Sequence, residues 1–146
     1  MERNKKAEEV LAEIYRNAQL AIQSIVDITP QVDDEEVKAE LAAQHEAYEG
    51  FSARAAMIAK DRNIELKEPN PFKKAMMWGS IKMSSMSDNS RSHIADMMVQ
   101  GTVMGITAVR SSAGDIEPDG TDEIYTLLDE MIKAEEQFEK KWKEYL

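Results

Sequence analysis

Two histidines and a few carboxylates are the residues of this chain that could bind a metal ion. His45 and Glu49 are four residues apart, which puts them on one face of a helix. His93 and Glu135 lie in separate segments, each within a stripe of mostly apolar residues. Imidazole and carboxylate ligands suit iron, zinc or manganese. We therefore treat His93, Glu135, His45 and Glu49 as candidate metal ligands.

The same residues also have structural interpretations. His45 and Glu49 could form a solvated pair, and His93 could be a hydrogen-bonded core residue or stand at the start of a helix. Glu135, which adjoins Glu136 in an acidic segment, could face solvent after a small rotation of its helix. A buried carboxylate is costly unless it is paired. We therefore expect a polar layer in which His93 contacts Glu135, with or without a metal, joined by either His45 or Tyr48.

Composition excludes several classes of function. The chain has no cysteine, so it has neither disulfides nor thiolate metal sites. Its net charge of −10 argues against non-specific nucleic-acid binding. It contains no phosphate-binding loop, nucleophile elbow or Walker motif, which favours a protein that is not an enzyme. No apolar run reaches the length of a membrane span and no secretory signal opens the chain, so we expect a cytoplasmic protein.

Four amphipathic segments with helical periodicity must position these residues. The first runs from about Asn4 to Ile28 and ends at Thr29-Pro30, because proline cannot continue a helix. The predicted N-cap residues of the second and last helices are Asp33 and Thr121. The predicted inner faces are, in the first helix, Ala7, Leu11, Ile14, Ala18, Ala21, Ile25 and Ile28; in the second, Val37, Leu41, Gln44, Tyr48, Phe51, Ala55 and Ile58; and in the last, Ile124, Leu128, Met131, Glu135, Phe138, Trp142 and Tyr145.

The third segment begins at Asn70-Pro71 and reaches about Ser112, with Gly114 as its stop. Its predicted inner stripe is Phe72, Met76, Gly79, Met83, Met86, Ser90, His93, Met97, Gln100 and Met104. Residues 87–90 are a candidate break, because Ser, Asp and Asn compete with the helical backbone for hydrogen bonds. Gly101 and Gly105 would allow close approach of another backbone.

Long amphipathic helices joined by short connections predict a single all-α domain over residues 1–146. The expected architecture is an antiparallel up-down-up-down four-helix bundle. Residues 70–113 carry five basic and only two acidic residues, and their apolar arc is wider than three neighbouring helices require. The excess of apolar surface predicts a homodimer or higher homo-oligomer formed through residues 70–113. A central third helix with loosely packed methionines is the other interpretation.

Three runs in this segment carry a family resemblance: Asn70-Pro71-Phe72, Trp78 to Met83, and Ser92 to Met98. With the helix layout, they resemble uncharacterised bacterial four-helix-bundle proteins of the ferritin-like superfamily. Ferritin-like enzymes place a Glu on each of two helices and a Glu-x-x-His pair on each of the other two. This chain has no Glu-x-x-His, and His93-x-x-Asp96 reverses the order. The resemblance therefore implies the fold without the di-iron site.

Three hypotheses of function follow. The first is a non-enzymatic, self-associating interaction or structural protein of the cytoplasm. The alternative is a degenerate metal-binding or redox bundle that uses His93 and Glu135 to hold iron, manganese or zinc. The third is a peripheral membrane-associated module that uses Trp78 and its neighbouring lysines.

Overall fold

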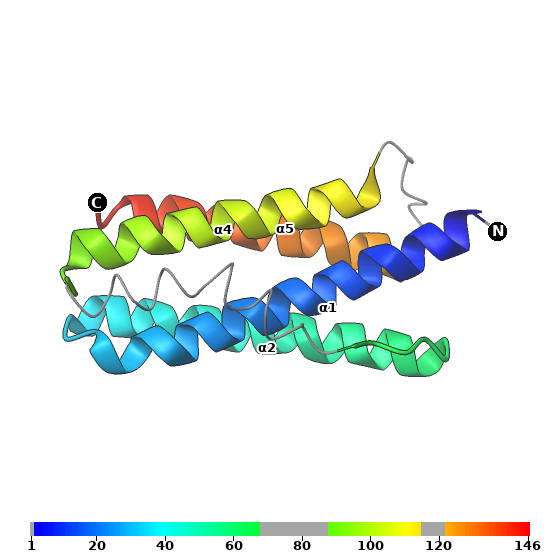
Figure 1. Ribbon diagram of the computed structural model, residues 1–146, viewed down its shortest axis with the longest axis horizontal. Helices are drawn as coiled ribbons and strands as arrows, with labels where there is room; N and C mark the ends of the chain where they lie inside the picture. Colours follow the sequence, from blue (N-terminus) through cyan, green and yellow to red (C-terminus); the bar gives the residue numbers. More distant parts are fainter. Residues whose placement is uncertain (1, 68–87, 115–121) are drawn as a thin grey trace.

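The computed structural model describes residues 2–67, 88–114 and 122–146. These ranges contain four long helices, α1 (Glu2–Ile28), α2 (Glu35–Asp61), α4 (Arg91–Ala113) and α5 (Glu123–Lys143), with a 3-10 turn η1 (Thr29–Gln31) between the first two. The helices lie side by side as a bundle, and the described ranges contain no strand (Figure 1). The all-α prediction is confirmed for these ranges. None of the described helices is long and apolar enough to cross a membrane.

The boundary between α1 and α2 follows the local sequence. The 3-10 turn Thr29–Gln31 ends α1 where Thr29-Pro30 was predicted to end it. The N-cap of α2 is Asp34, whose Oδ1 accepts the backbone N–H groups of Glu36 and Val37 at 3.0 and 3.1 Å. The prediction of Asp33 is wrong by one residue, because the Asp33 carboxylate instead accepts the side-chain amide of Asn89 at 3.0 Å.

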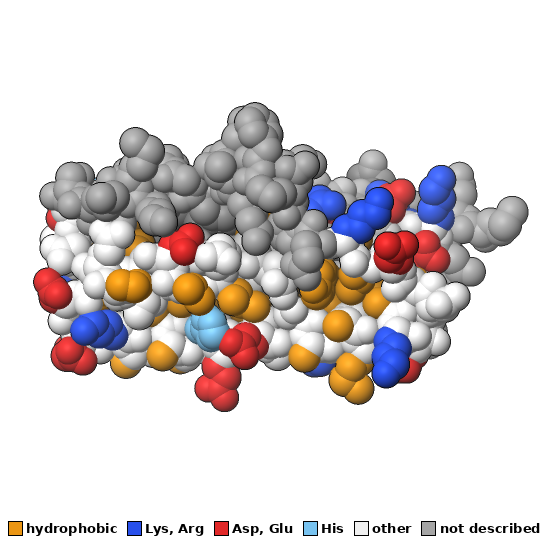
Figure 2. Space-filling view, turned by 60° about the horizontal axis from the view of Figure 1, so that its bottom comes forward, with side chains coloured by type: hydrophobic (Ala, Val, Ile, Leu, Met, Phe, Trp, Pro, Cys, Tyr) orange, Lys and Arg blue, Asp and Glu red, His pale blue; other side chains and the backbone are white. Residues whose placement is uncertain are grey.

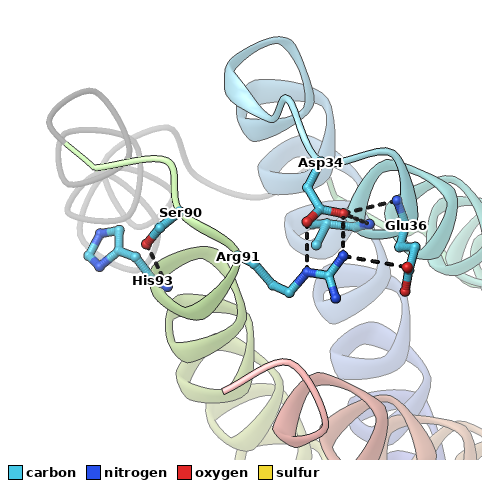
Figure 3. A network of polar contacts seen from close by, with 6 residues as sticks. Asp34, Glu36, Ser90, Arg91 and His93 are labelled. Atoms are coloured by element: carbon cyan, nitrogen blue, oxygen red, sulfur yellow. Dashed lines mark hydrogen bonds and ion pairs between the residues drawn. The ribbon is translucent and has the colours of Figure 1, made fainter.

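The start of α4 lies at the predicted break. Ser90 is its N-cap, and the Ser90 hydroxyl accepts the backbone N–H of His93 at 3.3 Å (Figure 3). The helix ends at Gly114, whose positive φ of 59° suits glycine, as predicted. The N-cap of α5 is Asp122 and not the predicted Thr121, and the Asp122 carboxylate accepts the N–H of Ile124 at 2.8 Å. Thr121 and residues 70–87, with the runs at Asn70 and Trp78, lie outside the described residues.

The core confirms the predicted inner faces of α1 and α2, whose members are all buried. In the last predicted helix, Phe138 of α5 and Tyr145, which lies just beyond the end of α5, are only partly buried, and the rest of the predicted face is buried. The predicted stripe of α4 is wrong beyond Met97: Gln100 is exposed and Met104 is 45% exposed. The predicted stripe passes through residue 90, where the helix begins, and its spacing of 3.5 residues drifts against the 3.6 residues per turn of an α-helix. The buried face is Ile94, Ala95, Met97, Met98, Gly101, Thr102, Gly105 and Val109.

Contacts between helix ends establish the directions of the helices. Arg91, the first residue of α4, binds Asp34 at the start of α2, with Nε 2.6 Å from Oδ2 (Figure 3). At the other end, Arg62 follows α2 and binds Asp122 before α5, at 2.9 Å. Thus α2 and α4 begin at the same end and run in the same direction, whereas α1 and α5 run the opposite way (Figure 1). The predicted strict up-down-up-down order is not followed by these four helices.

Candidate functional site: a buried carboxyl in the middle of the bundle

Glu135 is the polar centre of the bundle. It lies on α5 and is only 1% exposed. The Asn17 side-chain amide of α1 donates to both of its carboxylate oxygens at 3.0 Å. The Tyr48 hydroxyl of α2 donates to Oε2 at 2.8 Å. One carboxyl group therefore connects three helices, and both of its oxygens have donors.

Gly105 of α4 closes the fourth side of this group. A Cβ atom at this position would lie 2.6 Å from Asn17 Oδ1 and 2.8 Å from Glu135 Oε2, so these hydrogen-bonded side chains would have to shift to make room for it. The close neighbours of Gly105 are side-chain atoms, so the close approach of another backbone stays a prediction. We call Asn17, Tyr48, Gly105 and Glu135 the central polar cluster. Each of the four described long helices contributes one residue to it.

Burial controls the ionisation of this cluster. Desolvation raises the pKa of Glu135 from its usual 4.5 to about 7, although the hydrogen bonds from Asn17 and Tyr48 act in the opposite direction. Burial also raises the pKa of Tyr48 well above its usual value, and the adjacent negative charge of Glu135 adds to this effect. Tyr48 therefore remains a hydrogen-bond donor throughout the neutral pH range.

A second buried polar contact joins α2 to α5 near the C-terminal end of α5. The indole Nε1 of Trp142 donates to Gln44 Oε1 at 2.9 Å, and Gln44 Nε2 donates to Glu40 at 2.8 Å. Trp142 and Gln44 are almost completely buried. This contact satisfies the polar atoms of both side chains and fixes α5 against α2.

His93 lies far from the central polar cluster. It is the third residue of α4, and its Nδ1 is 3.9 Å from Asp88 Oδ2. Twelve residues separate it from Gly105, a distance of about 18 Å along the helix. The expected contact between His93 and Glu135 is therefore wrong. The prediction fails because α4 begins at Arg91, so the middle of this helix lies near Gly105 and not at His93.

The interpretation of His93 as a helix-start residue is confirmed. Its side chain is 28% exposed, and its Nε2 is buried without a hydrogen-bond partner within residues 2–67, 88–114 and 122–146.

His45 and Glu49 form a pair on the surface of α2. Their Nδ1 and Oε1 atoms are 3.0 Å apart, and the side chains are 30% and 59% exposed. His45 also lines a groove of about 440 Å³ between the end of α1 and the start of α2. The side of the molecule at the bottom of Figure 1 carries hydrophobic side chains in a broken band among charged ones (Figure 2). The other lining residues of the groove are Ile25, Val26, Thr29, Pro30, Lys38 and Ala42.

The four candidate metal ligands thus fall at three separate places. Within the described ranges, no group of three or more His, Cys, Asp or Glu side chains could hold a metal ion. The oxygens of Glu135 already accept hydrogen bonds from Asn17 and Tyr48. The donor set around Glu135 consists of an amide N–H and a phenol O–H, which bind a carboxylate and not a cation. These described residues do not fit a ferritin-type metal centre.

The sequence indicated part of this site. Tyr48 and Glu135 belong to the polar layer as expected, whereas Asn17 was missed. Its only signal is a polar side chain, adjacent to Ala18, on a helix whose inner face is otherwise apolar. Comparison with protein-family models, with curated proteins and with solved structures finds no match to this chain.

Replacing Gly105 with alanine tests the close contact. In an exposed helix the change would stabilise the protein by up to about 1 kcal/mol. Here the new methyl group overlaps Asn17 and Glu135, so we expect Gly105→Ala to lower the free energy of unfolding by about 1–3 kcal/mol. Urea denaturation followed by circular dichroism measures the change. Gly50→Ala is the matched control, since nothing lies within 4 Å of its added Cβ; equal effects in both variants would contradict the contact.

The raised pKa of Glu135 predicts a pH dependence of stability. Because the pKa of Glu135 is higher in the folded state, this group adds fully to the free energy of unfolding below pH 4.5. That contribution is lost as the pH rises to about 7. The total loss is on the order of 3 kcal/mol. We expect Glu135→Gln, which cannot ionise, to lack this part of the pH dependence in urea denaturation between about pH 4 and pH 8. Glu136→Gln, with an exposed carboxylate, is the control; parallel pH curves for wild type and Glu135→Gln would disprove the interpretation.

Proposed function

We propose that this chain is a cytoplasmic, ferritin-like helical bundle that acts as a non-enzymatic, self-associating interaction or structural protein. The central polar cluster is the observation that carries this proposal. It occupies the middle of the bundle, where ferritin-like enzymes hold metal ligands, yet its polar side chains bind one another. Such a cluster favours one packing of the helices over others. The proposed interactions would then be made by the surface of the bundle.

Helix directions support the ferritin-like part of the proposal. Because α2 and α4 begin at the same end, the end of α2 and the start of α4 lie at opposite ends of the bundle. One long crossover between two antiparallel helix pairs is a feature of ferritin-like folds. The resemblance of Ser92 to Met98 to ferritin-like proteins agrees with this arrangement.

Self-association is the testable core of the proposal. We expect light scattering coupled to size-exclusion chromatography to give a dimer or a higher oligomer at micromolar concentration. The predicted interface lies within residues 70–113, of which 91–113 form α4. A single species with the mass of one chain, 16.5 kDa, across the micromolar range would disprove the proposal.

A degenerate metal-binding or redox bundle is the second candidate, and the buried, unpartnered Nε2 of His93 favours it within the described part of the chain. Elemental analysis of protein purified without a polyhistidine tag separates the two candidates. We expect iron, manganese and zinc each at well below one ion per chain, because His93 and Glu135 are too far apart to share an ion. Stoichiometric metal that is lost in His93→Ala would instead support the second candidate.

A further inference from the structure

The solvent-facing side of α4 carries an apolar centre. Val103 is 42% exposed at the middle of this face, and Val99 and Ile106 flank it, partly buried. At 100° per residue these three positions lie within 60° of one another around the helix axis. An exposed valine between two half-buried aliphatic side chains is a surface that a second helix could cover.

Two opposite charges lie at equal distances from this centre. Asp96 is seven residues before Val103 and Arg110 is seven residues after it, and both are exposed. Seven residues are close to two turns, so both charges share the stripe of Val103, each about 10 Å from it. They are about 21 Å apart along one helix and cannot pair with each other within one chain.

We propose that two copies of this chain associate through α4 as an antiparallel helix pair centred on Val103, with Asp96 of each copy bound to Arg110 of the other. This inference rests on the proposed self-association and specifies its geometry. An antiparallel pair with a two-fold axis at Val103 brings residue 96 of each copy opposite residue 110 of the other, which forms two identical ion pairs. A parallel pair would instead place equal charges opposite each other, which disfavours it.

The contacts of these charges within the chain are weak enough to be exchanged. Arg110 binds Glu136 at 2.8 Å, but the two side chains are 58% and 52% exposed. Asp96 accepts the amide of Gln100 at 3.0 Å in an exposed hydrogen bond. Exposed ion pairs contribute little to stability. Across the interface, the same charges would mainly fix the orientation and register of the two helices, while Val99, Val103 and Ile106 supply the apolar contact.

Charge reversal tests this geometry directly. Asp96→Arg alone places arginines 96 and 110 against each other, and Arg110→Asp alone does the same with two aspartates. We expect each variant to weaken dimerisation at least tenfold, measured by analytical ultracentrifugation of the full chain. Mixing the two variants restores both ion pairs, so the mixture should form a heterodimer with an affinity within a few-fold of wild type.

Control variants distinguish a folding defect from the loss of the interface. Glu46→Arg and Lys60→Asp make matched charge changes at exposed positions of α2, and we expect both to dimerise as wild type does. Circular dichroism should give wild-type helix content for every variant. Wild-type dimerisation by Asp96→Arg or Arg110→Asp, or failure of the folded variants to form a heterodimer, would overturn this inference and leave the proposed self-association standing. A monomeric wild-type protein would overturn both.

Discussion

The carboxyl group of Glu135 is the constraint on which the packing of this bundle depends. A carboxyl group in an apolar interior is costly unless donors reach it. Asn17 and Tyr48 provide these donors from two different helices. Their hydrogen bonds offset part of the desolvation cost, but the raised pKa of Glu135 shows that burial outweighs them. The cluster therefore gives specificity to the packing at some cost in stability at neutral pH.

This constraint explains features at a distance from Glu135. The α4 backbone covers the carboxyl closely, and a glycine at position 105 leaves room for Asn17 and Glu135 where they lie. The ends of the helices are held separately, by Arg91 with Asp34 at one end and Arg62 with Asp122 at the other. These exposed ion pairs add little energy, but they agree with the alignment that the buried cluster requires.

The position of the cluster also bears on function. In a four-helix bundle the middle of the core is the usual place for a metal or cofactor, and here protein side chains occupy it. Both oxygens of Glu135 already accept hydrogen bonds from protein side chains. The two histidines are partly exposed, one at a helix start and one in a pair on the surface. The chemistry of the core is thus internal hydrogen bonding. Features available to another molecule lie outside, among them the face of α4 around Val103.

The sequence alone determined that the described segments are helical, and it determined the buried faces of α1, α2 and most of α5. Apolar periodicity is a local property, so the inner stripes of α1 and α2 were correct at every position, as were the helix ends at Pro30 and Gly114. Only the tertiary structure decided which polar residues meet. A shift in where α4 begins moves His93 by several turns relative to Glu135, and sequence periodicity does not set that height. The role of Asn17 depends on the same inter-helix alignment, because one polar residue on an apolar helix becomes a hydrogen-bond donor only when a carboxyl from another helix lies opposite it.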